Sequence, residues 1–207
     1  MNYNFINKIN GWVVFAIATI VYLLTIEDTA SLWDCGEYIT AAYKLEVGHP
    51  PGAPLYMILG RVFSFFAAPE NVAYYINCLS ALSSSFTILF MYWSITLLVT
   101  TLILHGKNEL EKHDQIGIFV AATIGSLAYT FTDSFWFSAV EGEVYAMASL
   151  FTAVIFWAIL KWDEEMAALQ ANRLSNDVAP NRWLLLILFL LGLAIGVHLL
   201  GILVILA

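Results

Sequence analysis

Several uninterrupted runs of apolar residues, each long enough to cross a lipid bilayer, constrain this 207-residue chain more than any other feature. A spanning helix needs about 20 apolar residues, whereas a barrel strand needs only about 10. Hydrocarbon cannot hydrogen-bond exposed backbone groups, so runs of this length predict helices. A composition that is 61% apolar and 12% charged also leaves too little polar surface for a soluble domain. We therefore expect an all-α polytopic membrane protein.

The apolar runs predict about five transmembrane helices. They cover residues 11–27, 76–104, 116–132, 145–161 and 183–207. The loop over residues 28–75 holds two helix-like pieces, separated by a Gly- and Pro-rich stretch at 48–54. The second piece, residues 55–68, is shorter than a span and carries Arg61, so we expect interfacial helices in this outer loop. If that piece did cross the membrane, every later span would have the opposite orientation.

The basic residues indicate which way the spans run, because such residues concentrate in cytoplasmic loops. Only Lys44 and Arg61 fall on the side of the first loop. Six fall on the other side: Lys8, Lys107, Lys112, Lys161, Arg173 and Arg182. This distribution places the N-terminus inside. The loop 28–75 and the segment 133–144 then lie outside, in a periplasm or a lumen.

The two ends of the chain and its charge narrow the class further. The first run has no small-residue cleavage site, so we interpret it as a retained signal anchor. The last run is apolar to the final residue, so residues 1–207 are expected to be the N-terminal portion of a longer domain.

The net charge of −8 argues against a nucleic-acid partner. Cys35 and Cys78 are too few for a metal cluster, and both a disulfide and two free thiols stay open.

Two carboxylates, Asp34 and Glu37, follow the first span on the outer side. Three residues apart on a helix, they would share one face. Clustered carboxylates in a partly apolar setting can act as a general base or bind a divalent cation. The plainer interpretation is a helix start, with Asp34 as the N-cap and Glu37 completing a capping box.

A rigid turn follows at Gly48-His49-Pro50-Pro51-Gly52-Ala53-Pro54. Proline and glycine fix such a turn and would set His49 at the membrane interface. A rigid turn suits a site that must hold its shape. A simple break between two interfacial helices explains the same residues equally well.

The remaining polar candidates come from the second outer segment and the last span. Glu141, Glu143 and Tyr145 lie among aromatic residues that commonly anchor a chain at the interface. His198 lies within an apolar run, and an ionisable residue there indicates function by default. Glycines at 192, 196 and 201 equally allow a packed, neutral histidine.

All these candidates fall on or toward the outer side, which predicts an outward-facing polar pocket between the spans and the first loop. With these residues in hand, the chain resembles the polytopic glycosyltransferases of the GT-C fold, which carry an acidic motif and a His-Pro-Pro element in the first outer loop. Asp34 and Glu37 match the first element, and His49-Pro50-Pro51 with Leu55 matches the second.

A closer resemblance is to a bacterial membrane family of formerly unknown function, related to protein O-mannosyltransferases. Its motifs Trp-Asp-x-Gly-Glu, Gly-His-Pro-Pro-Gly-x-Pro-Leu and Gly-x-x-x-Gly-Val-His match residues 33–37, 48–55 and 192–198. The resemblance covers nearly the whole chain. It implies the N-terminal part of a GT-C-like fold in a bacterial inner membrane, with the active site facing the periplasm.

The resemblance also implies a reaction: transfer of mannose or a similar sugar from a polyprenyl-phosphate donor to an acceptor hydroxyl of a protein or glycan. Asp34 and Glu37 would be catalytic, with Asp34 as the general base. The implied substrate-binding residues are His49, Arg61, Glu141, Glu143, Tyr145 and His198, and Lys44 is a further candidate for the departing phosphate. No cofactor is implied with certainty; a divalent cation stays open.

Two other functions remain open on the sequence. In a transporter or flippase, Asp34, Glu143 and His198 would form a relay for a proton or a substrate. The position of the carboxylates near the surface, away from the midplane, argues against this. In a non-catalytic scaffold, the outer loops would bind a partner protein, and replacing Asp34 would have no effect.

Overall fold

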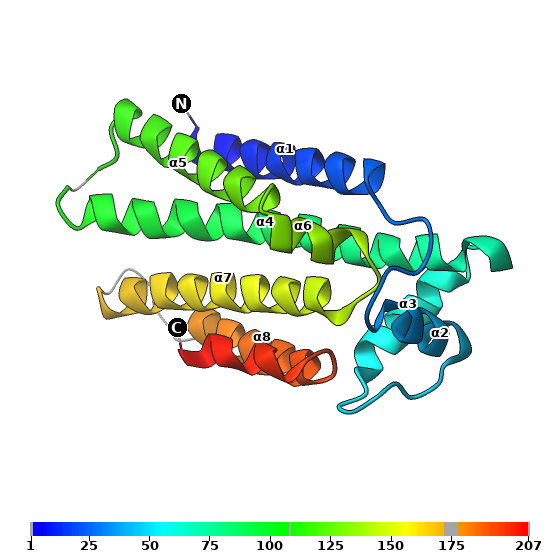
Figure 1. Cartoon of the computed structure of the whole chain (residues 1–207). Helices are drawn as coiled ribbons and strands as arrows, with labels where there is room; N and C mark the ends of the chain where they lie inside the picture. Colours follow the sequence, from blue (N-terminus) through cyan, green and yellow to red (C-terminus); the bar gives the residue numbers. More distant parts are fainter. Residues whose placement is uncertain (1, 108, 172–177, 207) are drawn as a thin grey trace.

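The computed structural model describes residues 2–107, 109–171 and 178–206, and the regular structure in these ranges is entirely helical. Its elements are α1 (Tyr3–Leu24), α2 (Cys35–Lys44), α3 (Pro54–Ser64), η1 (Pro69–Asn71), α4 (Val72–Leu104), α5 (Lys112–Thr130), α6 (Asp133–Val140), α7 (Val144–Gln170), α8 (Val178–Ile195) and η2 (Leu199–Leu206). The long helices lie side by side, and α2 and α3 cover one end of them (Figure 1).

The chain is an integral membrane protein, and three of its helices are long and apolar enough to cross a bilayer. These are α1, η1 with α4 (Pro69–Leu104), and α7. A fourth crossing is available if α5 and α6, bent by 66° relative to each other, form one span. The predicted count of about five therefore exceeds what length and composition support in the described part of the chain.

The expected final span is the part of the prediction from which the structure differs most. Helix α8 ends at Ile195, and the chain turns over residues 196–198 before η2 runs back beside it (Figure 1). The backbone oxygen of Gly196 accepts a hydrogen bond of 2.8 Å from the Leu55 amide at the start of α3. A Cβ on Gly196 would lie 3.3 Å from the Cβ of Leu55, so glycine permits this close approach. His198 therefore lies in a turn after a helix and not within one.

Helix α4 is central to the packing, because α1, α5 and α7 all pack against it. Its buried side is rich in small hydroxyl residues, including Ser83, Ser85 and Thr87, whose hydroxyls donate to backbone carbonyls four residues earlier. Small residues allow helices to approach closely in a membrane. At the covered end, α2 and α3 are equally close, since a Cβ on Gly60 would lie 2.8 Å from the Cβ of Ala42.

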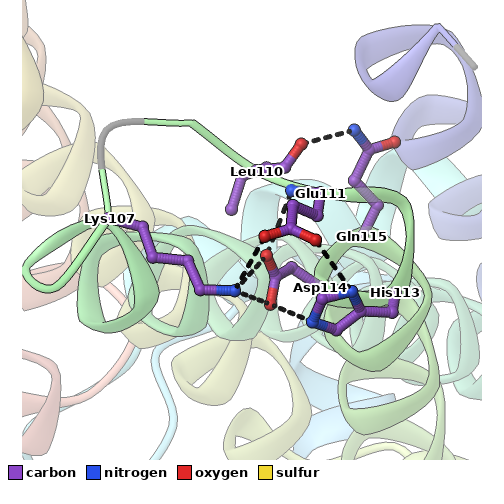
Figure 2. Close-up of polar contacts among 6 residues, drawn as sticks. All are labelled: Lys107, Leu110, Glu111, His113, Asp114 and Gln115. Carbon is purple, nitrogen blue, oxygen red and sulfur yellow. Dashed lines mark hydrogen bonds and ion pairs between the residues drawn. The ribbon is translucent and has the colours of Figure 1, made fainter.

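The connection between α4 and α5 lies at the opposite end of the bundle (Figure 1), and Figure 2 shows its polar contacts. Lys107 forms ion pairs with Asp114 at 2.9 Å and with Glu111 at 3.7 Å. Glu111 and Asp114 also form a reciprocal capping box at the start of α5, and His113 lies within 3.4 Å of both. These contacts stabilise the start of α5 and give Lys107, Glu111, His113 and Asp114 a structural role.

Candidate active site

Four segments that are far apart in the sequence meet at the covered end of the bundle. The Glu27 amide donates to the backbone oxygen of Val140 at 3.0 Å, which joins the loop after α1 to the end of α6. The side-chain amide of Asn77, at the start of α4, donates to the backbone oxygens of Glu27 and Thr29. The turn after α8 meets α3 through Gly196. The predicted site residues lie on or beside these segments.

Asp34, Glu37 and His49 form a cluster on the exposed side of α2, here called the exposed cluster. The backbone N–H of His49 donates to Glu37 Oε1 at 2.6 Å, and His49 Nδ1 lies 3.1 Å from Glu37 Oε2. His49 Nε2 lies 4.0 Å from Asp34 Oδ2. The Asp34 side chain is 58% exposed, so it is open to solvent.

The same geometry weakens the interpretation of Asp34 and Glu37 as helix caps. Asp34 is the residue before α2, yet its side chain makes no capping hydrogen bond. Glu37 binds His49 and does not complete a capping box. The two hydrogen bonds from His49, backbone first, lower the pKa of Glu37, which therefore stays ionised. Beside them, Trp33 has a φ of 65°, a strained conformation of the kind that gathers at functional sites.

A backbone hydrogen bond closes the turn that presents His49. The Gly52 amide donates to the His49 backbone oxygen at 2.8 Å, and Gly52 has a φ of 91°. A Cβ on Gly48 would lie 3.3 Å from Glu37 Oε1 and 3.0 Å from Met57 Cε. Glycine at these two positions lets the turn close over the Glu37 carboxylate.

Ser31, Cys35, Glu141 and Glu143 form a second cluster behind the first, here called the buried cluster. The Ser31 hydroxyl donates to Glu141 Oε2 at 2.5 Å, and the Cys35 thiol donates to Glu143 Oε1 at 3.4 Å. Ser31 Oγ also lies 3.0 Å from Cys35 Sγ. Glu141 and Glu143 are only 3% and 6% exposed. These two carboxyl groups point into the protein, away from the side on which Asp34 lies open.

Burial dominates the electrostatics of this second cluster. It raises the pKa of Glu141 and of Glu143 above the ordinary carboxyl value, and neighbouring negative charges add to the shift. Burial likewise raises the pKa of the Cys35 thiol to about 12. The thiol is therefore protonated at neutral pH and able to donate its hydrogen bond.

Tyr38 connects the two clusters and was not predicted from the sequence. It is buried on α2, and its ring lies 5.6 Å from the His49 ring and 5.6 Å from that of Tyr56. Burial, with the charges of Asp34 and Glu143, raises the pKa of Tyr38 to about 12. Its phenol therefore stays neutral between the two groups of carboxylates.

Arg61 lies apart from both clusters. Its guanidinium donates to the backbone oxygen of Tyr43 at 2.5 Å and packs against the rings of Tyr43 and Phe65. Tyr43 is near the end of α2, and nine residues at ~1.5 Å each separate it from Asp34 along that helix. The contacts of Arg61 thus brace the far end of α2 against α3. Lys44 is exposed at the same far end of α2.

Tyr145 and His198 meet at a different place, on the wall of an apolar cavity of about 470 Å³. Their ring centroids are 5.6 Å apart. The cavity lies between α4, α5, α7 and η2, and its lining includes Met91, Leu98 and Phe156.

Among the residues that the structure describes, two sets of side chains have the ligand types and spacing for a metal ion. The ligand atoms of Asp34, Glu37 and His49 lie within 4.8 Å of one another, and so do those of Cys35, Glu141 and Glu143. The exposed set, with two carboxylates and an imidazole, suits a divalent cation. The buried set already satisfies its polar atoms through Ser31 and Cys35. Both cysteines are free thiols.

Comparisons with known proteins identify the family of this chain. The family model described as "Protein O-mannosyl-transferase TMEM260 N-terminal domain" matches residues 34–207. The chain is 30% identical over 147 residues to "Protein O-mannosyl-transferase tmem260" of Dictyostelium discoideum, covering 70% of this chain and 16% of that protein. It is 26% identical over 162 residues to "Protein O-mannosyl-transferase TMEM260" of Mus musculus, covering 78% of this chain and 21% of that protein.

The chain thus spans a fifth or less of the Dictyostelium relative and about a fifth of the mouse one. No solved structure matches it. The family match covers most of the chain and contains Asp34, Glu37 and His49. On that match, the chain belongs to the family of protein O-mannosyl-transferase TMEM260 N-terminal domains.

Proposed function

We propose that this chain carries the catalytic end of a GT-C-type protein O-mannosyltransferase. The reaction moves mannose or a similar sugar from a polyprenyl-phosphate donor to a Ser or Thr hydroxyl of an acceptor protein at the outer membrane face. The main support for the proposal is the exposed Asp34 carboxylate, which lies beside His49 at the end of the bundle covered by α2 and α3. The names of the two relatives support the same activity.

Asp34 acts as the general base in this proposal. As the acceptor hydroxyl attacks the anomeric carbon, its proton passes to the Asp34 carboxylate. A new carbon–oxygen bond forms on one face of the sugar while the bond to the donor phosphate breaks on the other. The polyprenyl phosphate leaves with the bonding electrons. The outcome is inversion at the anomeric carbon.

His49 and Glu37 serve the departing phosphate. Glu37 fixes the backbone and the ring of His49 through two contacts, which leaves Nε2 directed toward Asp34 and the open side. A fixed imidazole can stabilise the negative charge that develops on the phosphate. Asp34, Glu37 and His49 are also the residues that would hold a divalent cation, which would supply further positive charge to that phosphate.

The apolar cavity between α4 and α7 suits the polyprenyl tail of the donor. Its volume of about 470 Å³ and its lining of Met, Leu and Phe side chains fit an isoprenoid chain. Tyr145 and His198 on its wall would contact the donor where its tail meets its head group. This arrangement explains why a reaction on polar sugars takes place within a membrane protein. We place the protein in a bacterial inner membrane with the exposed cluster facing the periplasm.

The test uses the protein as encoded, in membranes, with radiolabelled polyprenyl-phosphate mannose and a Ser/Thr-rich acceptor peptide. Asp34→Asn keeps the size of the side chain and removes the base, so transfer should fall by about 100-fold or more. Glu70→Gln is the matched control, because it removes one exposed negative charge from η1 and should leave transfer unchanged. Transfer that is indifferent to Asp34→Asn would overturn the assignment.

The transporter or flippase alternative makes a different prediction in the same membranes. It requires movement of a substrate driven by an ion gradient, without lipid-linked sugar. The exposed cluster lies at the end of the bundle and not at its middle, which favours the transferase (Figure 1). Gradient-driven uptake that is abolished by Asp34→Asn, with no sugar transfer by wild type, would favour the transporter.

A further inference from the structure

The buried cluster joins two segments that are about 110 residues apart in the sequence. Ser31 and Cys35 lie on either side of Asp34, one in the loop before α2 and one in its first turn. Glu141 and Glu143 lie in the turn between α6 and α7. Ser31 binds Glu141 and Cys35 binds Glu143, so the two carboxyl groups hold the chain on either side of Asp34. These two contacts are here called the grip.

The backbone around this grip is held as well. The Glu143 amide donates to the Glu141 backbone oxygen at 3.0 Å, which fixes the turn itself. A Cβ on Gly142 would lie 2.7 Å from Asn77 Oδ1 and 3.0 Å from Ile39 Cγ1, so the turn lies tightly between α2 and α4. The backbone N–H of Asp34 also interacts with the Glu143 carboxyl group.

These contacts are unlike those expected of substrate-binding residues. A substrate would have to displace Ser31 and Cys35 and enter a space in which the two carboxyl groups are 3% and 6% exposed. Moreover, the buried groups satisfy one another, with one hydroxyl and one thiol donating to two carboxyl groups. A satisfied buried network makes one geometry rigid.

We infer that Glu141 and Glu143 are positioning residues, which fix the Asp34 segment against the α6–α7 turn through Ser31 and Cys35. The catalytic importance of this grip rests on the proposed transferase function, whereas its existence does not. Because a base must lie within hydrogen-bond reach of its proton, a loosened Asp34 segment would slow the reaction without weakening the attachment of the donor tail.

The grip can be measured without any enzymatic activity, through the reactivity of Cys35. Its thiol is fully buried and lies within the grip, so a membrane-permeant maleimide reaches it only when the segment opens. In a Cys78→Ser background, Glu143→Ala removes the hydrogen-bond acceptor. The labelling rate of Cys35 should rise by about tenfold, as the loss of one buried hydrogen bond predicts. Ser31→Ala should produce a smaller rise.

The conservative variant separates positioning from direct catalysis. Glu143→Gln keeps an oxygen that can accept from Cys35, so labelling should stay within about twofold of wild type and transfer should be largely retained. Glu143→Ala should lower kcat with little change in KM for the donor. Asp34→Asn changes only an exposed side chain, which makes no contact with Ser31, Cys35, Glu141 or Glu143 that holds the segment, and should leave Cys35 labelling unchanged.

Each result of this pair of measurements supports or overturns the inference. Faster labelling in Glu143→Ala and near-normal labelling in Glu143→Gln support it, even if wild type transfers no sugar, in which case only the transferase proposal fails. Labelling that does not respond to Glu143→Ala would overturn the grip. Loss of transfer in Glu143→Gln with normal labelling would overturn the positioning role, because Glu143 would then act on the substrate directly.

Discussion

Two groups of carboxylates lie near the first turn of α2, and they differ in exposure, hydrogen-bond partners and pKa. Asp34 and Glu37 are open to solvent and lie beside His49, whereas Glu141 and Glu143 are buried with Ser31 and Cys35. Hydrogen bonds from His49 lower the pKa of Glu37, and burial raises the pKa of Glu141 and Glu143.

The contrast shows that a carboxylate near a membrane surface does not by itself indicate catalysis. An open, ionised carboxylate can accept a proton from a substrate, whereas a buried carboxyl group that accepts hydrogen bonds within the protein is better suited to hold a structure together. A catalytic base on a loop needs both kinds of carboxyl group, because holding the loop in one conformation costs conformational entropy. The predictions below probe that division.

After Asp34 itself, the largest effect is expected at His49, the histidine of the exposed cluster. His49→Ala removes the imidazole that Glu37 holds and leaves the departing phosphate without it, so transfer should fall by about 10- to 100-fold. His113→Ala is the matched control, since His113 is an exposed histidine paired with carboxylates at the other end of the bundle. Equal losses in the two variants would contradict a special role for the exposed cluster.

The turn that carries Glu141 and Glu143 should be sensitive to overpacking. In Gly142→Ala the new Cβ meets Asn77 and Ile39, so the protein should lose about 1–3 kcal/mol of unfolding free energy. Gly117→Ala on α5 is the control, because nothing lies within 4 Å of its Cβ and alanine favours a helix. Thermal unfolding in detergent would compare them. A Gly142→Ala protein as stable as Gly117→Ala would show that the turn is not tightly held.

The two clusters should also respond to pH in opposite directions. The lowered pKa of Glu37 means that its stabilising contacts are present above the ordinary carboxyl pKa and are lost as pH falls through the lowered value. The raised pKa values of Glu141 and Glu143 mean that their neutral forms stabilise the fold at low pH, and that this contribution is lost as pH rises through the raised values.

A direct check compares thermal midpoints between about pH 4 and 8. Wild type should lose its advantage over Glu37→Gln as the pH falls. The Glu141→Gln, Glu143→Gln double variant should gain on wild type as the pH rises, because its amides do not ionise. A double variant with the wild-type pH profile would contradict the assignment of raised pKa values to these two groups.

The smallest effect is expected at Tyr145, which lies on the wall of the apolar cavity beside His198. Tyr145→Phe keeps the ring beside His198 and should change the KM for the donor by less than about twofold. Tyr145→Ala removes an aromatic contact worth about 0.5–1.5 kcal/mol, so the KM should rise by about two- to tenfold. Tyr129→Phe, a conservative change elsewhere on the cavity wall, serves as a control. No change in Tyr145→Ala would remove this residue from the donor site.

Most of the helices follow from the apolar runs, because lipid exposure demands both length and composition. The predicted spans 76–104 and 116–132 correspond to α4 and α5, and the interfacial pieces correspond to α2 and α3. The break after Ile195 could not be predicted, since it depends on a contact between Gly196 and Leu55, which are distant in sequence. The predicted end of a span at residue 132 agrees with the break between α5 and α6, but the sequence did not predict that residues 133–140 continue as a helix bent by 66°.

The exposed cluster was readable for a local reason: Asp34, Glu37 and His49 occur within 16 residues and near a Gly- and Pro-rich turn. The buried cluster was not, because Ser31 and Cys35 acquire a role only when the fold brings Glu141 and Glu143 beside them. Arg61 was predicted to bind substrate from its charge alone, and its contacts with Tyr43 and Phe65 come from the packing of α3 on α2. Its binding role stays a prediction.

The central claim is that the exposed Asp34 carboxylate does chemistry while the buried Glu143 carboxyl group holds Asp34 in place. The most direct test replaces one carboxyl oxygen by an amide nitrogen at each position and measures sugar transfer from polyprenyl-phosphate mannose in the same membranes. Asp34→Asn should lower transfer by about 100-fold or more, and Glu143→Gln should keep it within a few-fold of wild type. Equal losses at the two positions, or a greater loss in Glu143→Gln, would contradict the account.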